Sequence, residues 1–397
     1  MRFGVILDCE TLHGQTHYQR HQDLLKEAVV AEEAGFDFLG LSQQHFLMDW
    51  SPVSAPEVIF GALSQITSRI HLRHTIEELL NYNHPIRTAE RLATEDILLH
   101  GRLEVGTGRG NNLHILEGFG VDPSETRAQW RENFEVIVRA MSEDPFSFEG
   151  EYWSIPPRSI TPKCVQDPHP PFFLGSQGLD THQLAGQLGI GCMSTAHWRG
   201  WDAGEQCVAA YREAVRDAKP LTGVIHESIG PVFLGAHCAP TLEQAVDEAY
   251  RTTISFIDGL VDLFFKLGQA ADASGAKYSH GEEAEVVMRD LQEFEKRGRD
   301  LAWLAGRASY LALGTPDTLI EKFKRVEAMG YDEVLLRLDG MEPEVNRRSI
   351  EDFGRYVIPE FKCPSRIVRG RGAGYDELHE GVRADLERAT QRKGGAK

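Results

Sequence analysis

The sequence contains no C-x-x-C pair, no apolar run long enough to cross a membrane and no excess of basic residues. Its 6 cysteines are scattered, which favours reduced thiols in a cytosol over a disulfide framework or a zinc site. The apolar start is too short for a signal peptide, so we expect a cytoplasmic protein that does not bind membranes. The formal net charge of -18 disfavours nucleic acid as a partner, because neutralising phosphate requires clustered lysine and arginine.

The sequence also lacks a clear metal-ligand motif. His13, His17 and His21 have a spacing that would suit a metal only on a helix, and Gly14 weakens a helix there. We interpret these histidines as solvated loop residues and expect no metal.

No linker rich in proline, glycine and serine divides the chain, and strand and helix patterns alternate about eight times. This alternation predicts an α/β fold, a (β/α)8 TIM barrel with an insertion after the seventh strand, over residues 259–306. We assign residues 1–368 to the barrel and residues 369–397 to a charged C-terminal tail. The predicted strands are 2–7, 36–41, 70–80, 103–105, 171–175, 190–194, 228–234 and 332–338.

Polar side chains follow the predicted strands, where a barrel of this kind places its function. Because the carboxyl ends of parallel strands meet at one mouth, we expect these side chains to converge there. They are Asp8, His45, Glu77, Arg109, Ser176 and Ser194.

The stretch from Gly101 to Gly110 reads G-R-L-E-V-G-T-G-R-G, a short strand that runs into glycines around one arginine. Glycines let backbone approach a ligand and point N–H groups at an anion, and Arg109 adds donors suited to phosphate. The alternative is a tight turn with a surface arginine. A Rossmann dinucleotide turn fits poorly, because Asn111 stands where its third glycine should be.

Nine segments together resemble the bacterial-luciferase-like, flavin-dependent monooxygenases. The resemblance covers roughly residues 2–361, and the order and spacing of the segments make it fairly specific. The segments are 2–4, 44–46, 84–85, 101–110, 119–122, 148–152, 170–176, 313–316 and 330–334.

This resemblance implies a barrel that binds reduced FMN or, in a sister branch, the deazaflavin F420. It implies that Arg109, beside Gly108, meets the flavin phosphate together with Ser176, Gln177 and Gly178. It further implies that the insertion is a mobile lid, that the protein is a homodimer, and that a separate reductase supplies the reduced flavin.

His45 matches the catalytic histidine of the family. Reduced flavin adds O2 to give a hydroperoxide, and a group that titrates near neutral pH must manage the protons. The family usually has a Glu-His-His run at this place, whereas this chain has Gln43-Gln44-His45. The alternative for His45 is a structural role at a strand end.

Glu77 departs from the small residues that the luciferases carry against the flavin ring at the end of the third strand. Glu77 could bind substrate, act as a base, or form an ion pair with Arg73 or Arg109. A cis peptide between Ile76 and Glu77, as in the luciferases, is possible at a cost of about 3–4 kcal/mol.

The sequence therefore predicts a two-component FMN-dependent monooxygenase that uses O2 to oxygenate a small organic substrate. One alternative is an F420-dependent oxidoreductase on the same barrel, which the acidity of the chain disfavours because F420 has an anionic tail. Another is a non-catalytic flavin-binding partner subunit. Four aromatic residues could form a wall of the substrate pocket: Phe46, Trp50, Trp198 and Trp201.

Overall fold

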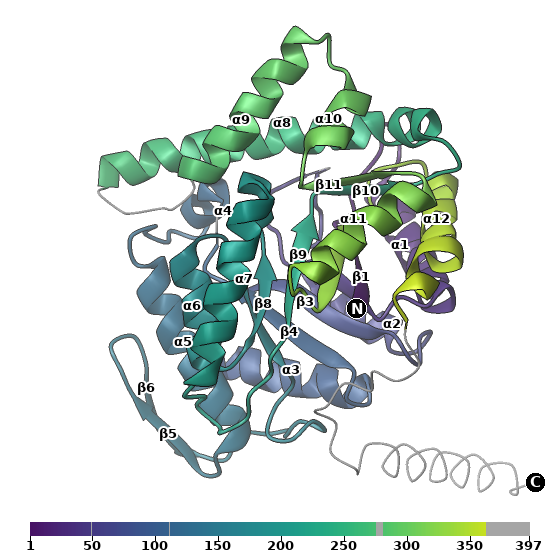
Figure 1. Cartoon of the computed structure of the whole chain (residues 1–397). Helices are drawn as coiled ribbons and strands as arrows, with labels where there is room; N and C mark the ends of the chain where they lie inside the picture. The colour runs from purple at the N-terminus through teal and green to yellow at the C-terminus, as the bar shows by residue number, and fades with distance from the viewer. Residues whose placement is uncertain (49, 111, 275–280, 363–397) are drawn as a thin grey trace, which may run out of the picture. The chain divides into compact units, whose positions relative to one another are not determined.

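Eight parallel strands close into a barrel in the computed structural model, and successive strands along the chain are neighbours around it (Figure 1). The structure describes residues 1–48, 50–110, 112–274 and 281–362, and the side chains of these residues outside 260–285. The predicted (β/α)8 barrel is confirmed, with a strand in each of the eight predicted ranges. The barrel strands are β1 (Arg2–Ile6), β2 (Phe38–Ser42), β3 (His71–Glu78), β4 (Leu103–Gly108), β7 (Phe172–Ser176), β8 (Gly191–Ser194), β9 (Ile229–Phe233) and β12 (Glu333–Arg337).

Helices cover the outside of the barrel between consecutive strands (Figure 1). They are α1 (His17–Ala34), α2 (Pro56–Leu63), α3 (Pro85–Leu98), α4 (Leu113–Gly118), α5 (Thr126–Ser142), α6 (Leu179–Leu188), α7 (Trp201–Arg216), α11 (Pro316–Ala328) and α12 (Pro343–Asp352). α1 ends at Ala34, and its C-cap residue Gly35 has a left-handed φ of 88°.

The start of α1 corrects one interpretation of the sequence. Thr16 and Gln19 form a capping box, so the helix begins at His17. His17 and His21 are therefore helical residues, and the Nδ1 atom of His21 lies 2.7 Å from the carbonyl oxygen of His17. The described residues contain no group of three or more His, Cys, Asp or Glu side chains placed to hold a metal ion.

The amino end of the barrel is filled by a buried ionic cluster. Arg73 lies between the rings of Phe38 and Phe173, at 3.7 and 3.8 Å from their centroids. Its guanidinium binds the carboxylates of Glu104 and Glu333, with an Nε–Oε2 distance of 2.8 Å to Glu104. Above this cluster, apolar side chains of five strands fill the barrel centre: Ile6, Phe38, Phe173, Met193 and Leu335.

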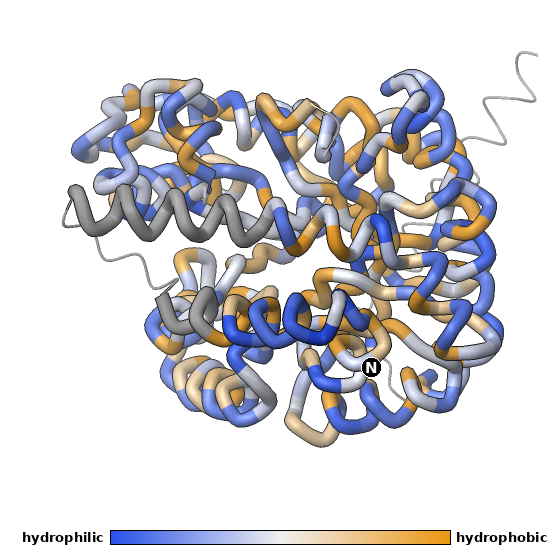
Figure 2. Tube along the Cα trace, turned by 90° about the horizontal axis from the view of Figure 1, so that it is seen from above, coloured by the Kyte–Doolittle hydropathy of each residue, from blue (hydrophilic) through white to orange (hydrophobic). Residues whose placement is uncertain are grey.

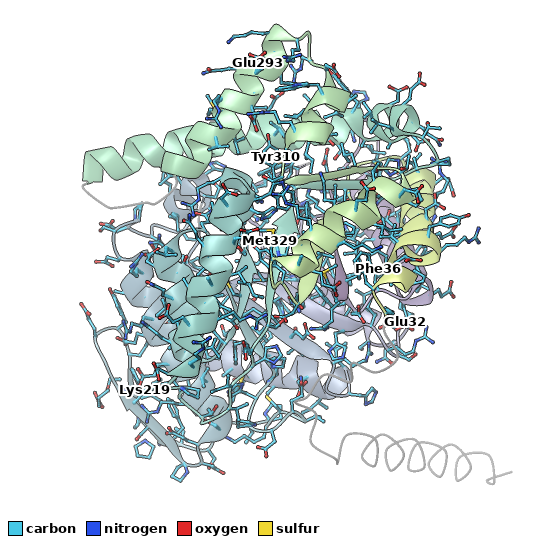
Figure 3. All side chains as sticks on the ribbon, viewed as in Figure 1. Glu32, Phe36, Lys219, Glu293, Tyr310 and Met329 are labelled. Carbon is cyan, nitrogen blue, oxygen red and sulfur yellow. The ribbon has the colours of Figure 1, made fainter. Side chains whose placement is uncertain are left out.

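The insertion follows β9 and is largely helical. It begins with β10 (Gly235–Cys238), which pairs in parallel with β11 (Leu311–Gly314), and includes α8 (Leu242–Ser274), α9 (Gly281–Lys296) and α10 (Leu301–Arg307). α8 and α9 lie at the end of the molecule shown at the top of Figure 1, and Lys219 lies towards the other end (Figure 3). Figure 2 views the molecule from above and shows hydrophilic and hydrophobic residues mixed along its helices. The insertion thus starts earlier than predicted. Residues 275–280 lie outside the described residues, and the mobile lid stays a prediction.

One further feature was not predicted, and one predicted feature lies outside the described residues. The long connection after α5 contains an antiparallel hairpin of β5 (Phe146–Glu149) and β6 (Ser154–Arg158). Residues 363–397, with the predicted tail and its boundary at residue 368, lie outside the described residues. Among the helices of the described part, none combines the length and the apolarity needed to span a membrane.

Candidate active site

A cavity of about 260 Å³ lies where the carboxyl ends of the barrel strands meet. Each of the eight barrel strands, or the residues just after it, contributes to the wall. The sequence predicted that polar side chains converge here, and Asp8, Arg109 and Ser176 do line the cavity. His45, Glu77 and Ser194 lie outside the lining, so the prediction of convergence holds for only part of the set.

The end of β4 brings Arg109 to the cavity. Gly106 lies where a Cβ atom would come within 2.4 Å of the carbonyl oxygen of His74, so only glycine fits between the strands. Gly108 lines the cavity floor beside Ile76, and Gly110 turns the chain with a left-handed φ of 72°. These glycines lead the chain to Arg109, which lines the cavity. The phosphate contact predicted for Arg109 stays a prediction.

The end of β7, the strand next to β4, supplies the neighbouring part of the wall. Ser176 and Gln177 line the cavity, and Gly178 is the N-cap residue of the ten-residue helix α6, which begins at Leu179. The Nδ1 atom of His182 lies 2.7 Å from the carbonyl oxygen of Gly178, which fixes this turn. The N-terminus of a helix carries a partial positive charge, so Arg109 and α6 present two anion-binding features to one cavity.

His45 lies behind the lining in an aromatic cluster. Its ring packs edge-on against Phe119, with centroids 4.9 Å apart, and the Nε2 atoms of His45 and Gln43 are 2.8 Å apart. Burial lowers the pKa of His45 below its usual value, although the carboxylate of Glu57 opposes the shift. The structure thus presents His45 as a half-buried, neutral ring that holds Gln43. Its predicted catalytic role stays untested.

Glu77 points away from the cavity, towards α3. Its carboxylate forms an ion pair with Arg91, and one oxygen lies 3.5 Å from the Nδ1 atom of His74. The ion-pair alternative therefore describes Glu77 better than a role in the cavity, but its partner is Arg91 rather than Arg73 or Arg109. Three X-Pro peptides are cis in the described residues, and the Ile76–Glu77 peptide is not among the cis bonds.

Glu78, the next residue, lines the cavity instead. The pairing of β3 with β4 shifts register between His74 and Glu77, and such a bulge changes which side chains face inward. The hydroxyl of Tyr82 donates a hydrogen bond to one carboxyl oxygen of Glu78. Burial raises the pKa of Glu78 to about 7, so this carboxyl titrates near neutral pH.

The opposite side of the cavity is occupied by an ion pair between β1 and β12. The Nε atom of Arg337 donates to Asp8 at 2.9 Å, and its Nη2 atom donates to Glu10 at 2.8 Å. The guanidinium lies 4.0 Å from the ring centroid of Phe256. These two carboxylates raise the pKa of Arg337 despite its burial, so the side chain stays charged.

Aromatic side chains form part of the wall near Arg337. The rings of Trp50 and Phe256 have centroids 5.3 Å apart, and both residues line the cavity together with Trp198. Of the four aromatic residues singled out in the sequence, Trp50 and Trp198 reach the cavity. Phe46 is about half exposed and contacts Phe119, and Trp201 packs near His197.

The fold and the site place the chain in a known family. The family model of luciferase-like monooxygenases matches residues 1–333, and the chain belongs to this family. The family predicted from the nine sequence segments is confirmed, and with it the prediction of a flavin-dependent monooxygenase as the enzyme class.

Several characterised proteins are similar over nearly the whole chain. The 4-hydroxyprotoasukamycin monooxygenase of Streptomyces nodosus is 26% identical over 382 residues, which are 93% of each chain. The oxygenase component of the flavin-dependent trigonelline monooxygenase of Acinetobacter baylyi is 22% identical, over 91% of this chain and 96% of that protein.

Solved structures share the fold at lower sequence identity. The oxygenating constituent of 3,6-diketocamphane monooxygenase from Pseudomonas putida, in complex with FMN, superposes with a TM-score of 0.69 and 21% identity, covering 91% of this chain and 98% of that one. The F420-dependent tetrahydromethanopterin reductase of Methanopyrus kandleri superposes with a TM-score of 0.64 and 20% identity, covering 91% and 99%. Both likenesses show the fold.

The sequence missed Glu78 and the pair of Asp8 with Arg337. Glu78 was overlooked because the resemblance singled out Glu77 at the end of the third strand, and a bulge leaves no trace in a single sequence. Asp8 stood at a predicted strand end, but its partner Arg337 lies 329 residues away. A search for opposite charges at the ends of the first and last strands would have suggested this pair, because these strands meet when a barrel closes.

Proposed function

We propose that the cavity binds reduced FMN and that the protein uses it with O2 to oxygenate a small organic substrate. In this proposal Arg109 holds the flavin phosphate. Ser176, Gln177 and the N-terminus of α6, which follows Gly178, are further hydrogen-bond donors. The observation that carries the proposal is that Arg109 and the residues that open α6 line one cavity.

The floor of the cavity suits a flat ring. Gly108 and Gly175 both line it, and a Cβ atom on either would approach the side chain of Ile76, at 3.0 and 2.8 Å. The side chain of Ile76 occupies the space that side chains on these two strands would fill, and it forms a small apolar surface on which a planar group can lie. Bound reduced flavin would supply the reaction with O2, and the chain would bind it, orient it and exclude water.

F420 is the alternative cofactor, and the F420-dependent reductase with the same fold makes it a serious one. A long anionic tail would need several basic groups at the mouth. Two arginines line the cavity, Arg109 and Arg337, and Arg337 is already bound by Asp8 and Glu10. The charge of the described cavity therefore favours FMN.

The test compares FMN with F420 by fluorescence quenching, and then measures oxygen-dependent conversion with a flavin reductase present. We expect FMN to bind and to support conversion of an organic substrate. Turnover only with F420 would contradict the proposal. The reductase as a partner follows from the two-component proposal, and the homodimer stays a prediction that sedimentation analysis can test.

A further inference from the structure

Glu78 is the carboxyl group in the cavity wall whose hydrogen bond comes from a neutral donor. The hydroxyl of Tyr82 binds its Oε2 atom, whereas Asp8, the other acidic residue of the wall, is bound by the guanidinium of Arg337. A carboxylate in an ion pair is a weak base because the cation stabilises its charged form. Glu78 is therefore the better proton acceptor of the two.

The position of Glu78 is fixed from both sides. The side-chain oxygen of Gln43 accepts a hydrogen bond from the backbone N–H of Glu78 at 3.2 Å, and the amide of Asn83 donates to its carbonyl oxygen at 3.1 Å. The Oε1 atom lies beside Gly110, 3.3 Å from where a Cβ atom would stand on that glycine. Because Gly110 itself lines the cavity, a side chain there would crowd this oxygen.

His45 supports this arrangement through Gln43. Since the oxygen of Gln43 accepts from Glu78, its amide nitrogen is the donor to the Nε2 atom of His45. The ring then accepts at Nε2 and is neutral, in agreement with the lowered pKa of His45. His45 is thus a positioning residue that holds Gln43, and through it the backbone of Glu78.

We infer that Glu78 exchanges a proton with the substrate, and that the substrate is a neutral, ring-bearing molecule with a hydroxyl group. The inference rests on the proposed function, because it places an organic substrate beside the flavin. The hydroxyl proton passes to Oε1 of Glu78, the electron pair stays on the substrate oxygen, and nothing is oxidised in this step. The carboxylate of Glu78 disfavours an anionic group beside it, and Trp50 and Phe256 offer flat apolar surfaces to a ring.

Other titratable and charged groups surround this carboxyl. They are Glu77 and Tyr82 near β3, His45 after β2, Arg109 after β4, Asp8 after β1 and Arg337 of β12. Glu77 opposes ionisation of Glu78, and Tyr82 favours it. The pKa of Glu78 of about 7 places its carboxylate form at and above neutral pH, where a base is needed.

The experiment measures binding of 4-ethylphenol and 4-ethylanisole to the FMN-loaded protein, by the fluorescence of Trp50 and Trp198 or by calorimetry. The phenol stays neutral below about pH 9, as tyrosine does, and the anisole lacks the hydroxyl proton. We expect the phenol to bind at least about tenfold more tightly than the anisole above pH 8, with a preference that rises as pH increases through the pKa of Glu78.

Glu78→Gln should lose the rise of the preference with pH, because its amide oxygen accepts a hydrogen bond but does not titrate, and it should still bind FMN. Tyr82→Phe should move the midpoint to higher pH, because the lost hydrogen bond stabilised the carboxylate; a purely structural role would leave the midpoint unmoved. Glu117→Gln is the matched control, since Glu117 is exposed on α4, and it should behave as the wild type. An unchanged rise of the preference with pH in Glu78→Gln would overturn the inference, whereas failure of the wild type to bind FMN would overturn the proposed function.

Discussion

At the amino end of the barrel, Arg73 is enclosed by two aromatic rings and two carboxylates. At the carboxyl end, Arg109 and Glu78 belong to the wall of a cavity. The charges of the first end are paired inside the barrel, whereas Arg109 and Glu78 line a space that a ligand can enter. We infer that the amino end serves stability and the carboxyl end serves function, as in other barrels of this class.

The largest expected effect comes from breaking the amino end. Arg73→Met leaves Glu104 and Glu333 buried without their main partner, so the free energy of unfolding should fall by about 3–5 kcal/mol. Urea denaturation measures this loss, and the folded fraction should bind FMN as the wild type does. Arg2→Met, at the more exposed rim of the same cluster, should cost less. Equal losses in the two variants would contradict this account of the amino end.

Two glycines sharpen the comparison. A Cβ atom on Gly106 would meet backbone oxygens of His74 and Thr75 at 2.4 and 2.5 Å, which cannot yield, so Gly106→Ala should cost about 1–3 kcal/mol. On Gly175 the nearest atom is the flexible end of Ile76, at 2.8 Å. Gly175→Ala should therefore keep its thermal stability and lose affinity for FMN. The reverse pattern in melting and binding would refute the assignment of the cavity floor.

A third effect, which is small near neutral pH, concerns acid. His197 is fully buried, and neither ring nitrogen has a hydrogen-bond partner among the described residues. Burial lowers its pKa from 6.5 to about 3, so the unfolded chain takes up this proton first as pH falls. Stability that is present above pH 6.5 is lost towards pH 3, at up to about 1.4 kcal/mol per pH unit for this one group.

His197→Leu should remove that part of the acid dependence, because an apolar side chain of similar size has nothing to protonate. Chemical denaturation at several pH values between 4 and 7.5 measures the slope, with wild type as reference. The amino end should add a further loss of stability below about pH 4.5, since Arg2 and Arg73 hold the pKa of Glu104 well below its usual value of 4.5 and the unfolded chain takes up that proton first. If His197→Leu left the slope of unfolding free energy against pH unchanged, the loss of stability in acid would come from another group.

Much of the fold could be predicted because its signals are local. Buried parallel strands appear as short apolar runs, and Gly35 and Pro85 mark a helix end and a helix start in the sequence as in the structure. The four-residue strands β10 and β11 could not be predicted, since they pair with each other across three helices. The start of α1 was within reach, because Thr16 and Gln19 spell its capping box.

The site was predictable where a residue follows its strand directly. Arg109 and Ser176 line the cavity because the strands β4 and β7 aim them there. Glu77 and Glu78 could not be told apart, since the bulge in β3 that exchanges their directions depends on the neighbouring strands. His45 lies in the loop after β2, where the sequence does not determine side-chain direction.

The central claim is that Arg109 holds the phosphate of FMN at the barrel mouth. Its most direct test compares the dissociation constants of FMN and riboflavin, which lacks the phosphate, for the wild type and Arg109→Met. We expect the wild type to prefer FMN by about tenfold to a hundredfold, and the variant to bind the two flavins nearly alike. An equal preference for FMN in Arg109→Met would contradict the account.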